Sequence, residues 1–224
     1  MTNRLHRWGK AEDRLDDFVI FCTAEKDINY EGKAKAFKEF FKIIEKYKPL
    51  QFGYEVRDVM LQDLDYTAKY EKVLEVIGVN TPQVGEISAV FDNFDNLKEA
   101  VKEIVKADLG LCVNICGLPD KVEECCRYAG MNMHSIESSL GFVGQIDMLP
   151  SRDILELATM CGHGMVSFSL VTEIVDLIKK GKIKLEKGCE LLRKPCHCGA
   201  INSTKAMRTF KKYIEKEDKK TQLK

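Results

Sequence analysis

The sequence predicts an α/β fold made of alternating strand–helix units, followed by a helical segment that carries cysteines. Short apolar runs of strand length alternate with longer segments whose apolar residues recur at helical spacing, from Phe18 to about residue 137. Beyond residue 148 only helical patterns remain. We therefore expect an α/β domain over residues 1–148, with a polar N-terminal arm, and a helical segment over residues 149–224 that packs on it and ends in a frayed tail.

The predicted strands are apolar or alternating runs bounded by turn residues. They cover Phe18–Cys22, Phe52–Leu61, Ile87–Phe91, Leu109–Cys116 and Asn132–Glu137.

The predicted helices have apolar residues at intervals of three and four. Those of the α/β part span Lys33–Tyr47, Tyr66–Ile77, Leu97–Val105 and a stretch that Pro119 opens; those of the C-terminal part span Met165–Lys180, Lys184–Arg193 and a stretch that begins near Ser203.

Strand direction is left open by these patterns. Alternation of strands and helices favours βα units with right-handed crossovers. A ferredoxin-like α+β sandwich is the alternative, because Phe52–Leu61 could pair antiparallel with a neighbour.

Composition excludes some classes of function. The chain has 35 basic and 35 acidic residues, so a protein that binds nucleic acid or an anionic membrane over its whole surface is not expected. The longest apolar run, Ala158–Ile178, has helical periodicity and is interrupted by charged residues, which indicates a buried helix and no membrane span. The first residues lack the apolar stretch of a secretory signal, so we expect a cytoplasmic protein.

Nine cysteines are the most informative feature of the composition. In the reducing cytosol, disulfides are rare, and an odd number of thiols could not all pair within one chain. Such cysteines are expected to bind metal, to take part in catalysis or to fill the core.

Two short segments place cysteine beside glycine or proline. In Thr159-Met-Cys-Gly-His-Gly-Met165, Cys161 precedes an apolar helical pattern, so we expect it at or just before a helix N-terminus, where a thiolate is favoured. In Lys194-Pro-Cys-His-Cys-Gly199, Cys196 and Cys198 share a turn. Core packing explains this arrangement poorly, which makes Cys161, Cys196 and Cys198 the predicted metal ligands.

An iron–sulfur cluster fits three thiolates flanked by glycine turns, because thiolates bind the irons and backbone N–H groups can approach the sulfides. A [4Fe–4S] cluster held by three cysteines leaves one iron open. Zinc is the alternative, with His163 or His197 as the fourth ligand. The two histidines could equally donate hydrogen bonds or protons beside the site.

Three further residues are candidates for an additional ligand or a supporting role. Cys116 ends a strand before Gly117, at the kind of strand end where ligands gather in α/β sheets, although a half-buried core position explains it as well. Cys189 has the spacing of an apolar helix face, which favours a core residue. Asn202 follows the second cysteine segment and is expected to cap a helix.

The C-terminal third resembles an uncharacterised family of anaerobic archaea and bacteria. The resemblance lies in Leu149-Pro150, Ile154-Leu155, Thr159 to Met165, Pro195 to Gly199 and Asn202. It implies an iron–sulfur or other metal role and no particular catalytic residue.

Three functions follow as hypotheses. An open iron could bind a small-molecule substrate or sulfide, for lyase-type or sulfur-transfer chemistry. A closed cluster would suit an electron carrier or an assembly partner of a redox or sulfur protein. A zinc site would suit an interaction module. Neither a phosphate-binding loop nor a dinucleotide fingerprint is present, and catalytic residues and oligomeric state are not predicted.

Overall fold

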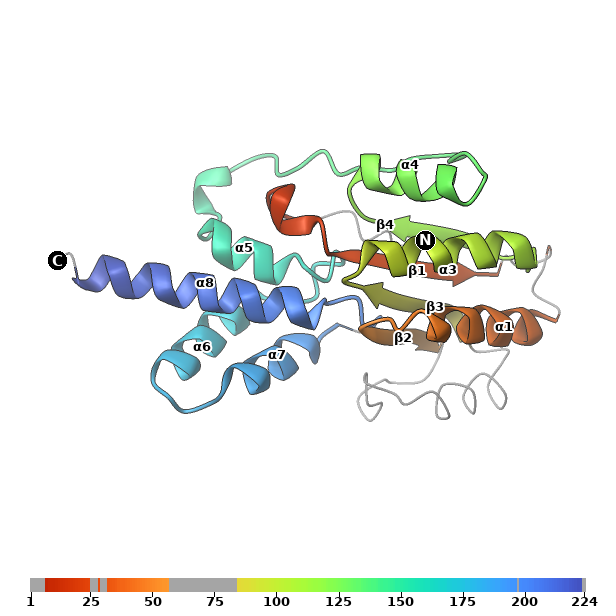
Figure 1. Cartoon of the computed structure of the whole chain (residues 1–224). Coiled ribbons are helices and arrows are strands. Elements are labelled where there is room, and N and C mark those ends of the chain that lie inside the picture. The colour runs from red at the N-terminus through yellow and green to blue at the C-terminus, as the bar shows by residue number, and fades with distance from the viewer. Residues whose placement is uncertain (1–6, 25–27, 29–31, 57–83, 197, 223–224) are drawn as a thin grey trace. The chain divides into compact units, whose positions relative to one another are not determined.

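A computed structural model of the chain describes residues 7–24, 28, 32–56, 84–196 and 198–222 (Figure 1). The chain divides into two compact units. The helical unit comprises Met1–Lys10, Glu137–Cys196 and Ile201–Lys224, and the sheet unit comprises Ala11–Ile136 and His197–Ala200. The sheet unit thus includes residues of the second cysteine segment.

Four strands form the sheet unit's single described sheet, in the order β2-β3-β1-β4. They are β1 (Phe18–Thr23), β2 (Gln51–Val56), β3 (Val84–Phe91) and β4 (Cys112–Cys116). Every described pairing is antiparallel. The predicted mixture of helices and strands is confirmed. In the sheet, β3 lies between the consecutive strands β1 and β2, an arrangement that local sequence patterns could not reveal.

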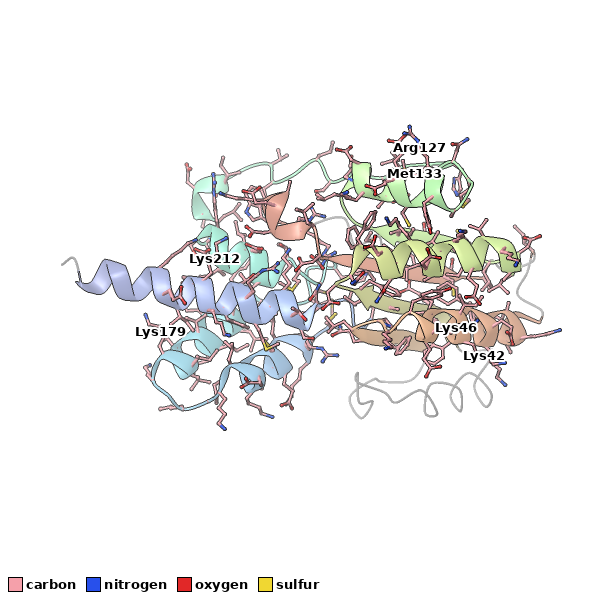
Figure 2. All side chains as sticks on the ribbon, in the orientation of Figure 1. Lys42, Lys46, Arg127, Met133, Lys179 and Lys212 are labelled. Carbon is pink, nitrogen blue, oxygen red and sulfur yellow. The ribbon has the colours of Figure 1, made fainter. Side chains whose placement is uncertain are left out.

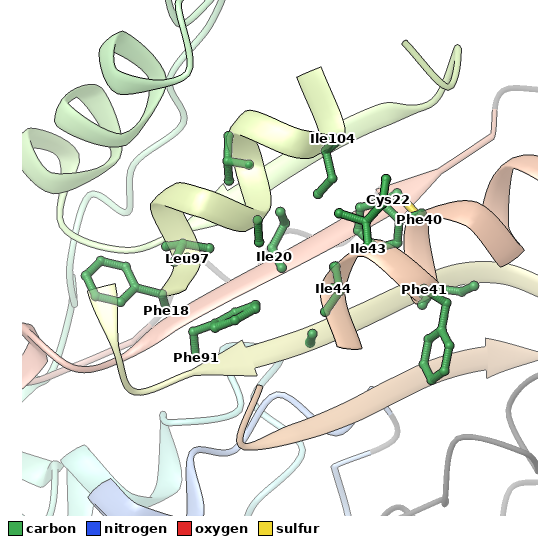
Figure 3. Packing of buried hydrophobic residues seen from close by; sticks show 14 of the residues in the cluster. Phe18, Ile20, Cys22, Phe40, Phe41, Ile43, Ile44, Phe91, Leu97 and Ile104 are labelled. Carbon is green, nitrogen blue, oxygen red and sulfur yellow. The ribbon is translucent and has the colours of Figure 1, made fainter. Parts of the chain in front are cut away.

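Helices α1 (Lys33–Lys46) and α3 (Phe94–Ala107) cover one face of the sheet, as Figure 3 shows. Their buried positions repeat at helical spacing and meet alternate residues of β1 and β3. Asn93 caps α3 by accepting a hydrogen bond from the backbone N–H of Asn96. The core contains mainly phenylalanine and isoleucine side chains, with Phe18, Phe37, Phe40, Phe41 and Phe91 all fully buried or nearly so.

The opposite face of the sheet carries a different set of side chains. Ile87 and Ala89 belong to the core, so Ser88 between them points to the other face. Phe52 packs against the core. Its neighbours in β2, Gln51 and Gly53, therefore lie on the opposite face of the sheet, together with Ser88.

Helix α4 (Pro119–Tyr128) begins at the proline that the sequence indicated. The strand predicted over Asn132–Glu137 is wrong, because no regular structure forms there and Ile136 is 60% exposed. The stretch, in which Figure 2 labels Met133, pairs with no described strand. An alternating pattern alone cannot make a strand when no neighbouring strand supplies the ladder of hydrogen bonds.

The helical unit contains α5 (Arg152–Ala158), α6 (Phe168–Lys179), α7 (Leu185–Arg193) and α8 (Ser203–Gln222). Two short 3-10 turns, Glu12–Arg14 in the sheet unit and Ile146–Met148 in the helical unit, complete the described elements. Helices α6 and α7 pack closely, because a Cβ added to Gly188 would lie 2.7 Å from Ile178. The predicted C-terminal helices are confirmed with small shifts at their ends.

Parts of the prediction fall on residues that the structure does not describe. These are the helix predicted over Tyr66–Ile77, the second half of the strand predicted over Phe52–Leu61, and His197. Among the described helices, none combines the length and the apolar character needed to cross a membrane.

Candidate functional site

Cys161 lies at the end of a helix and not at the beginning of one. Helix α5 ends at Ala158 with Thr159 as its C-cap, and the N–H of Gly162 donates to the Thr159 carbonyl at 2.8 Å. The next helix begins only at Phe168, behind its N-cap Ser167. The expectation of a helix N-terminus at Cys161 is therefore wrong, and with it the argument that a helix dipole favours the thiolate there. Gly162 and Gly164 adopt positive φ angles of 77° and 69° and turn the chain between the two helices.

The N-terminal arm holds the turn that leads into Cys161. The Nε of Arg7, whose side chain is buried, donates to the Met160 carbonyl at 3.1 Å, and the backbone N–H of Trp8 donates to Thr159 Oγ1 at 2.8 Å. The Trp8 ring also packs on Phe142, with centroids 5.4 Å apart. The sequence predicts a polar N-terminal arm, but it does not predict that this arm supports the first cysteine segment.

Cys161 is fully buried and has His163 as a near neighbour. The distance from Cys161 Sγ to His163 Nδ1 is 3.7 Å, within hydrogen-bonding reach of a sulfur atom. Gly162, with its positive φ, lies between the two residues and brings both side chains to the same side. A buried thiol beside an imidazole can share a proton with it or bind a metal ion together with it.

Cys196 and Cys198 are both withdrawn from solvent, at 0% and 6% exposure. Helix α7 ends at Arg193, and the N–H of Cys196 donates to the Arg193 carbonyl at 2.9 Å. Cys198 belongs to the sheet unit, where Ser88 Oγ donates to its carbonyl at 2.9 Å. Cys196 therefore follows a helix C-terminus, and the Cys198 backbone is hydrogen-bonded to strand β3.

Asn202 caps helix α8, as expected. Its Oδ1 accepts a hydrogen bond of 2.9 Å from the backbone N–H of Lys205, and its carbonyl accepts from Ala206. Lys205 itself is 2% exposed, and its Nζ lies 3.6 Å from Glu156 Oε1 on α5. The first turn of α8 is thus fixed to α5 by a buried pair of opposite charges, directly after the second cysteine segment.

Four other cysteines behave as core residues. Cys22 and Cys125 belong to the core of the sheet unit, and Cys126 and Cys189 are buried on their helices. Burial raises the pKa of Cys125 to about 12 and that of Cys189 to about 12, and it raises the pKa values of Cys22 and Cys126 as well. A thiol with such a pKa stays protonated at neutral pH in the metal-free chain, as is usual for a cysteine packed in a core.

The remaining two cysteines lie half-buried on β4. The register places Cys112, Asn114 and Cys116 on the face of the sheet that also carries Ser88. The Nδ2 of Asn114 approaches Cys112 Sγ at 3.5 Å. Strand β1 separates β4 from β3, so Cys116 lies two strands away from the Ser88 that holds the Cys198 carbonyl.

The nine cysteines, all of them within the described part of the chain, form no disulfide. Among the described residues, no group of three or more Cys, His, Asp or Glu side chains converges as metal ligands do. The geometry thus defines a mixed α/β chain with buried thiols in two tightly held turns. No family model matches this chain, and comparisons with curated proteins and with solved structures found no match.

Sequence reasoning missed the residues that hold these turns. They are Arg7 and Trp8 for the first segment and Gln51, Gly53 and Ser88 for the second. A signal for the latter group was present, since glycine inside a strand often marks the close approach of another backbone.

Proposed function

We propose that this chain binds an iron–sulfur cluster, [4Fe–4S] in type, through Cys161, Cys196 and Cys198. The observation that carries the proposal is the burial of two neighbouring cysteines, Cys196 and Cys198, beside proline and glycine, with the Cys198 backbone hydrogen-bonded to a sheet. Buried cysteines usually fill apolar cores, but this turn is rich in polar backbone groups and is flanked by proline and glycine. Thiolates in such turns are common ligands of iron–sulfur clusters.

Features of the first cysteine segment also support the proposal. Cys161 is fully buried, and the glycines that follow it keep the backbone unencumbered by side chains. With three protein thiolates, the cluster would supply an open iron that acts as a Lewis acid toward a small-molecule substrate or carries sulfide. The chain's own contribution would be to hold the three thiols and to exclude water from them.

The first test is anaerobic purification and reconstitution, followed by iron, sulfide and zinc analysis. Cys161→Ser, Cys196→Ser and Cys198→Ser should each lose iron and the visible absorption band, whereas Cys112→Ser, a control on strand β4, should keep both. Full retention of iron in any one of the three variants would remove that cysteine from the ligand set. Spectral changes on adding substrate or sulfide would favour the open iron, and a fourth cysteine ligand would favour a closed electron-transfer or assembly cluster.

One distance favours a second candidate, a zinc-stabilised module. Two donors on one tetrahedral zinc ion, a sulfur at about 2.3 Å and a nitrogen at about 2.05 Å, lie about 3.6 Å apart. The observed separation of Cys161 Sγ and His163 Nδ1 is 3.7 Å. In a cubane cluster each iron takes a single protein ligand, so there the same histidine would instead donate a hydrogen bond to the Cys161 sulfur.

The two candidates predict different results for His163→Ala. If one zinc ion is shared by Cys161 and His163, the variant should lose most of its zinc affinity in competition with a chelator. If Cys161 binds a cluster, the variant should keep its iron content and shift only the spectrum or the reduction potential. If the wild-type protein contains stoichiometric zinc and cannot be reconstituted with iron, the cluster proposal is refuted and the zinc-stabilised module takes its place.

We also infer that the sheet unit is a ferredoxin-like α+β sandwich. The support is its element order β1-α1-β2-β3-α3-β4 along the described chain, with the strand order β2-β3-β1-β4 and antiparallel neighbours. An experimental structure with a different strand order would refute this inference.

A further inference from the structure

The face of the sheet that points away from the core carries two polar side chains in strand positions. Ser88 on β3 is 1% exposed and Gln51 on β2 is 6% exposed. Burial of a hydroxyl or an amide is costly unless each finds a hydrogen-bond partner. Both find one in the same short piece of chain, the turn that contains Cys198.

Two consecutive backbone carbonyls accept these hydrogen bonds. Ser88 Oγ donates to the Cys198 carbonyl at 2.9 Å, and Gln51 Nε2 donates to the carbonyl of Gly199. The residues involved are 110 and 148 positions apart in sequence. Because both carbonyls are held, the backbone on either side of the Cys198–Gly199 bond has a fixed orientation, which in turn sets the direction of the Cys198 Cα–Cβ bond.

Two glycines allow the backbones to come this close. A Cβ added to Gly53 would lie 1.8 Å from the Cys198 carbonyl oxygen and 2.6 Å from its carbon. Gly199, at a positive φ of 65°, would place a Cβ 3.1 Å from the Gly53 Cα. Any side chain at position 53 would push the Cys198 turn off the sheet.

We propose that Gln51, Gly53 and Ser88 are positioning residues that preorganise Cys198 as a metal ligand. The proposal rests on the function proposed above. A metal ligand must be held within about 0.5 Å of its productive place, and side-chain rotamers alone do not achieve this on a loop. The sheet supplies this precision by binding the backbone carbonyls of Cys198 and Gly199.

The experiment compares Ser88→Ala, Gln51→Met and the double variant with wild type. Gln51→Met keeps the length of the side chain and removes the donor, and Ser88→Ala removes only the hydroxyl. Asn114→Ala is the matched control. Asn114 on β4 and Ser88 on β3 both pair with Phe21 of β1, so the two side chains lie on the same face of the sheet. The Asn114 side chain contacts Cys112 and not Cys198. Circular dichroism and urea unfolding establish that each variant is folded.

Two readouts are measured. The first is alkylation of Cys198 in the metal-free protein, followed site by site by mass spectrometry, with the core residue Cys189 as internal reference. Loss of one hydrogen bond should raise the Cys198 rate about fivefold, and the double variant should raise it more than tenfold. The second readout is the metal content and the visible spectrum after reconstitution. The metal content should fall and the spectrum should shift, more in the double variant than in the single variants. Asn114→Ala should leave both unchanged.

The outcomes separate this inference from the proposed function. If the wild-type protein binds neither iron nor zinc, the proposed function fails, and the alkylation rates still test the positioning. If the double variant is folded and matches wild type in both alkylation and spectrum, the positioning proposal is overturned even though metal binding stands. If the double variant does not fold, the single variants carry the same comparison.

Discussion

The buried ion pair at the start of α8 offers a quantitative test of how the region behind the second cysteine segment is held. Lys205 and Glu156 have side chains that are 2% and 10% exposed, with Nζ and Oε1 3.6 Å apart. Lys205 is also the third residue of α8, near the positive end of the helix dipole, which disfavours an ammonium group. The carboxylate of Glu156 is thus the counter-charge that this lysine requires.

The expected magnitude follows from Coulomb's law. At 3.6 Å and an effective dielectric constant of about 20, the attraction is about 4 to 5 kcal/mol. Removing one partner leaves the other charge buried, so Lys205→Met or Glu156→Leu alone should reduce the free energy of unfolding by about 3 to 5 kcal/mol. The double variant should be close to wild type, because apolar side chains of similar volume replace a pair whose attraction is largely offset by desolvation.

The assay is urea unfolding followed by tryptophan fluorescence. Trp8 is the single tryptophan of the chain and packs on Phe142 in the helical unit, so its emission reports on that unit. Lys187 and Glu190 on α7 are the matched control pair, closer at 2.8 Å but 50% and 58% exposed. Lys187→Met should reduce the free energy of unfolding by less than about 0.5 kcal/mol, because the pair is exposed to solvent. If Lys205→Met costs no more than Lys187→Met, or if the double variant is as unstable as the sum of its singles, the reasoning from burial is refuted.

Two other predictions concern a cysteine and a tyrosine. Cys189→Ala should keep the full metal content and cost less than about 1.5 kcal/mol in the free energy of unfolding, since one small buried side chain replaces another; metal analysis showing a loss would make Cys189 a ligand. Tyr47 donates to Glu103 Oε2 at 2.7 Å, and Lys46, labelled in Figure 2, donates to the other oxygen of the same carboxylate. The Tyr47–Glu103 hydrogen bond, with burial as the second cause, raises the pKa of Tyr47 from 10.0 to about 12. The neutral phenol is the stabilised form, so its contribution is complete below pH 10 and is lost as the pH rises toward about 12. The free energy of unfolding of wild type should therefore fall more steeply over this range than that of Tyr47→Phe, and parallel curves from alkaline urea titrations would contradict the assignment.

Local patterns predicted the elements whose apolar residues face one side. Helices α1 and α3 begin and end within a few residues of their predicted ends, because a one-sided apolar face is readable from spacing alone. Helix α5 was not predicted, since all of its residues from Ile154 to Ala158 are buried and leave no amphipathic pattern. Without that helix, Gly162 suggested the beginning of the following helix, although it belongs to the turn that ends α5.

The candidate ligands could be identified from residue type, but what holds them could not. Cysteine next to glycine or proline is visible in the sequence, as is the capping asparagine at position 202. The bonds from Gln51 and Ser88 to the second segment join residues more than a hundred positions apart, and their carbonyl acceptors are backbone groups that every residue has. Only the fold selects which carbonyls these donors meet.

The assignment of His197–Ala200 to the sheet unit has a consequence for the order of events during synthesis. All four strands and the helices that cover them lie before residue 129, so they leave the ribosome together and can fold early. The donors on Gln51 and Ser88 must then remain solvated until Cys198 and Gly199 emerge, about 70 positions after Tyr128, the last residue of α4. Insertion of the proposed cluster at the second cysteine segment would thus be a late step, one that a nascent chain stalled before residue 198 could not begin.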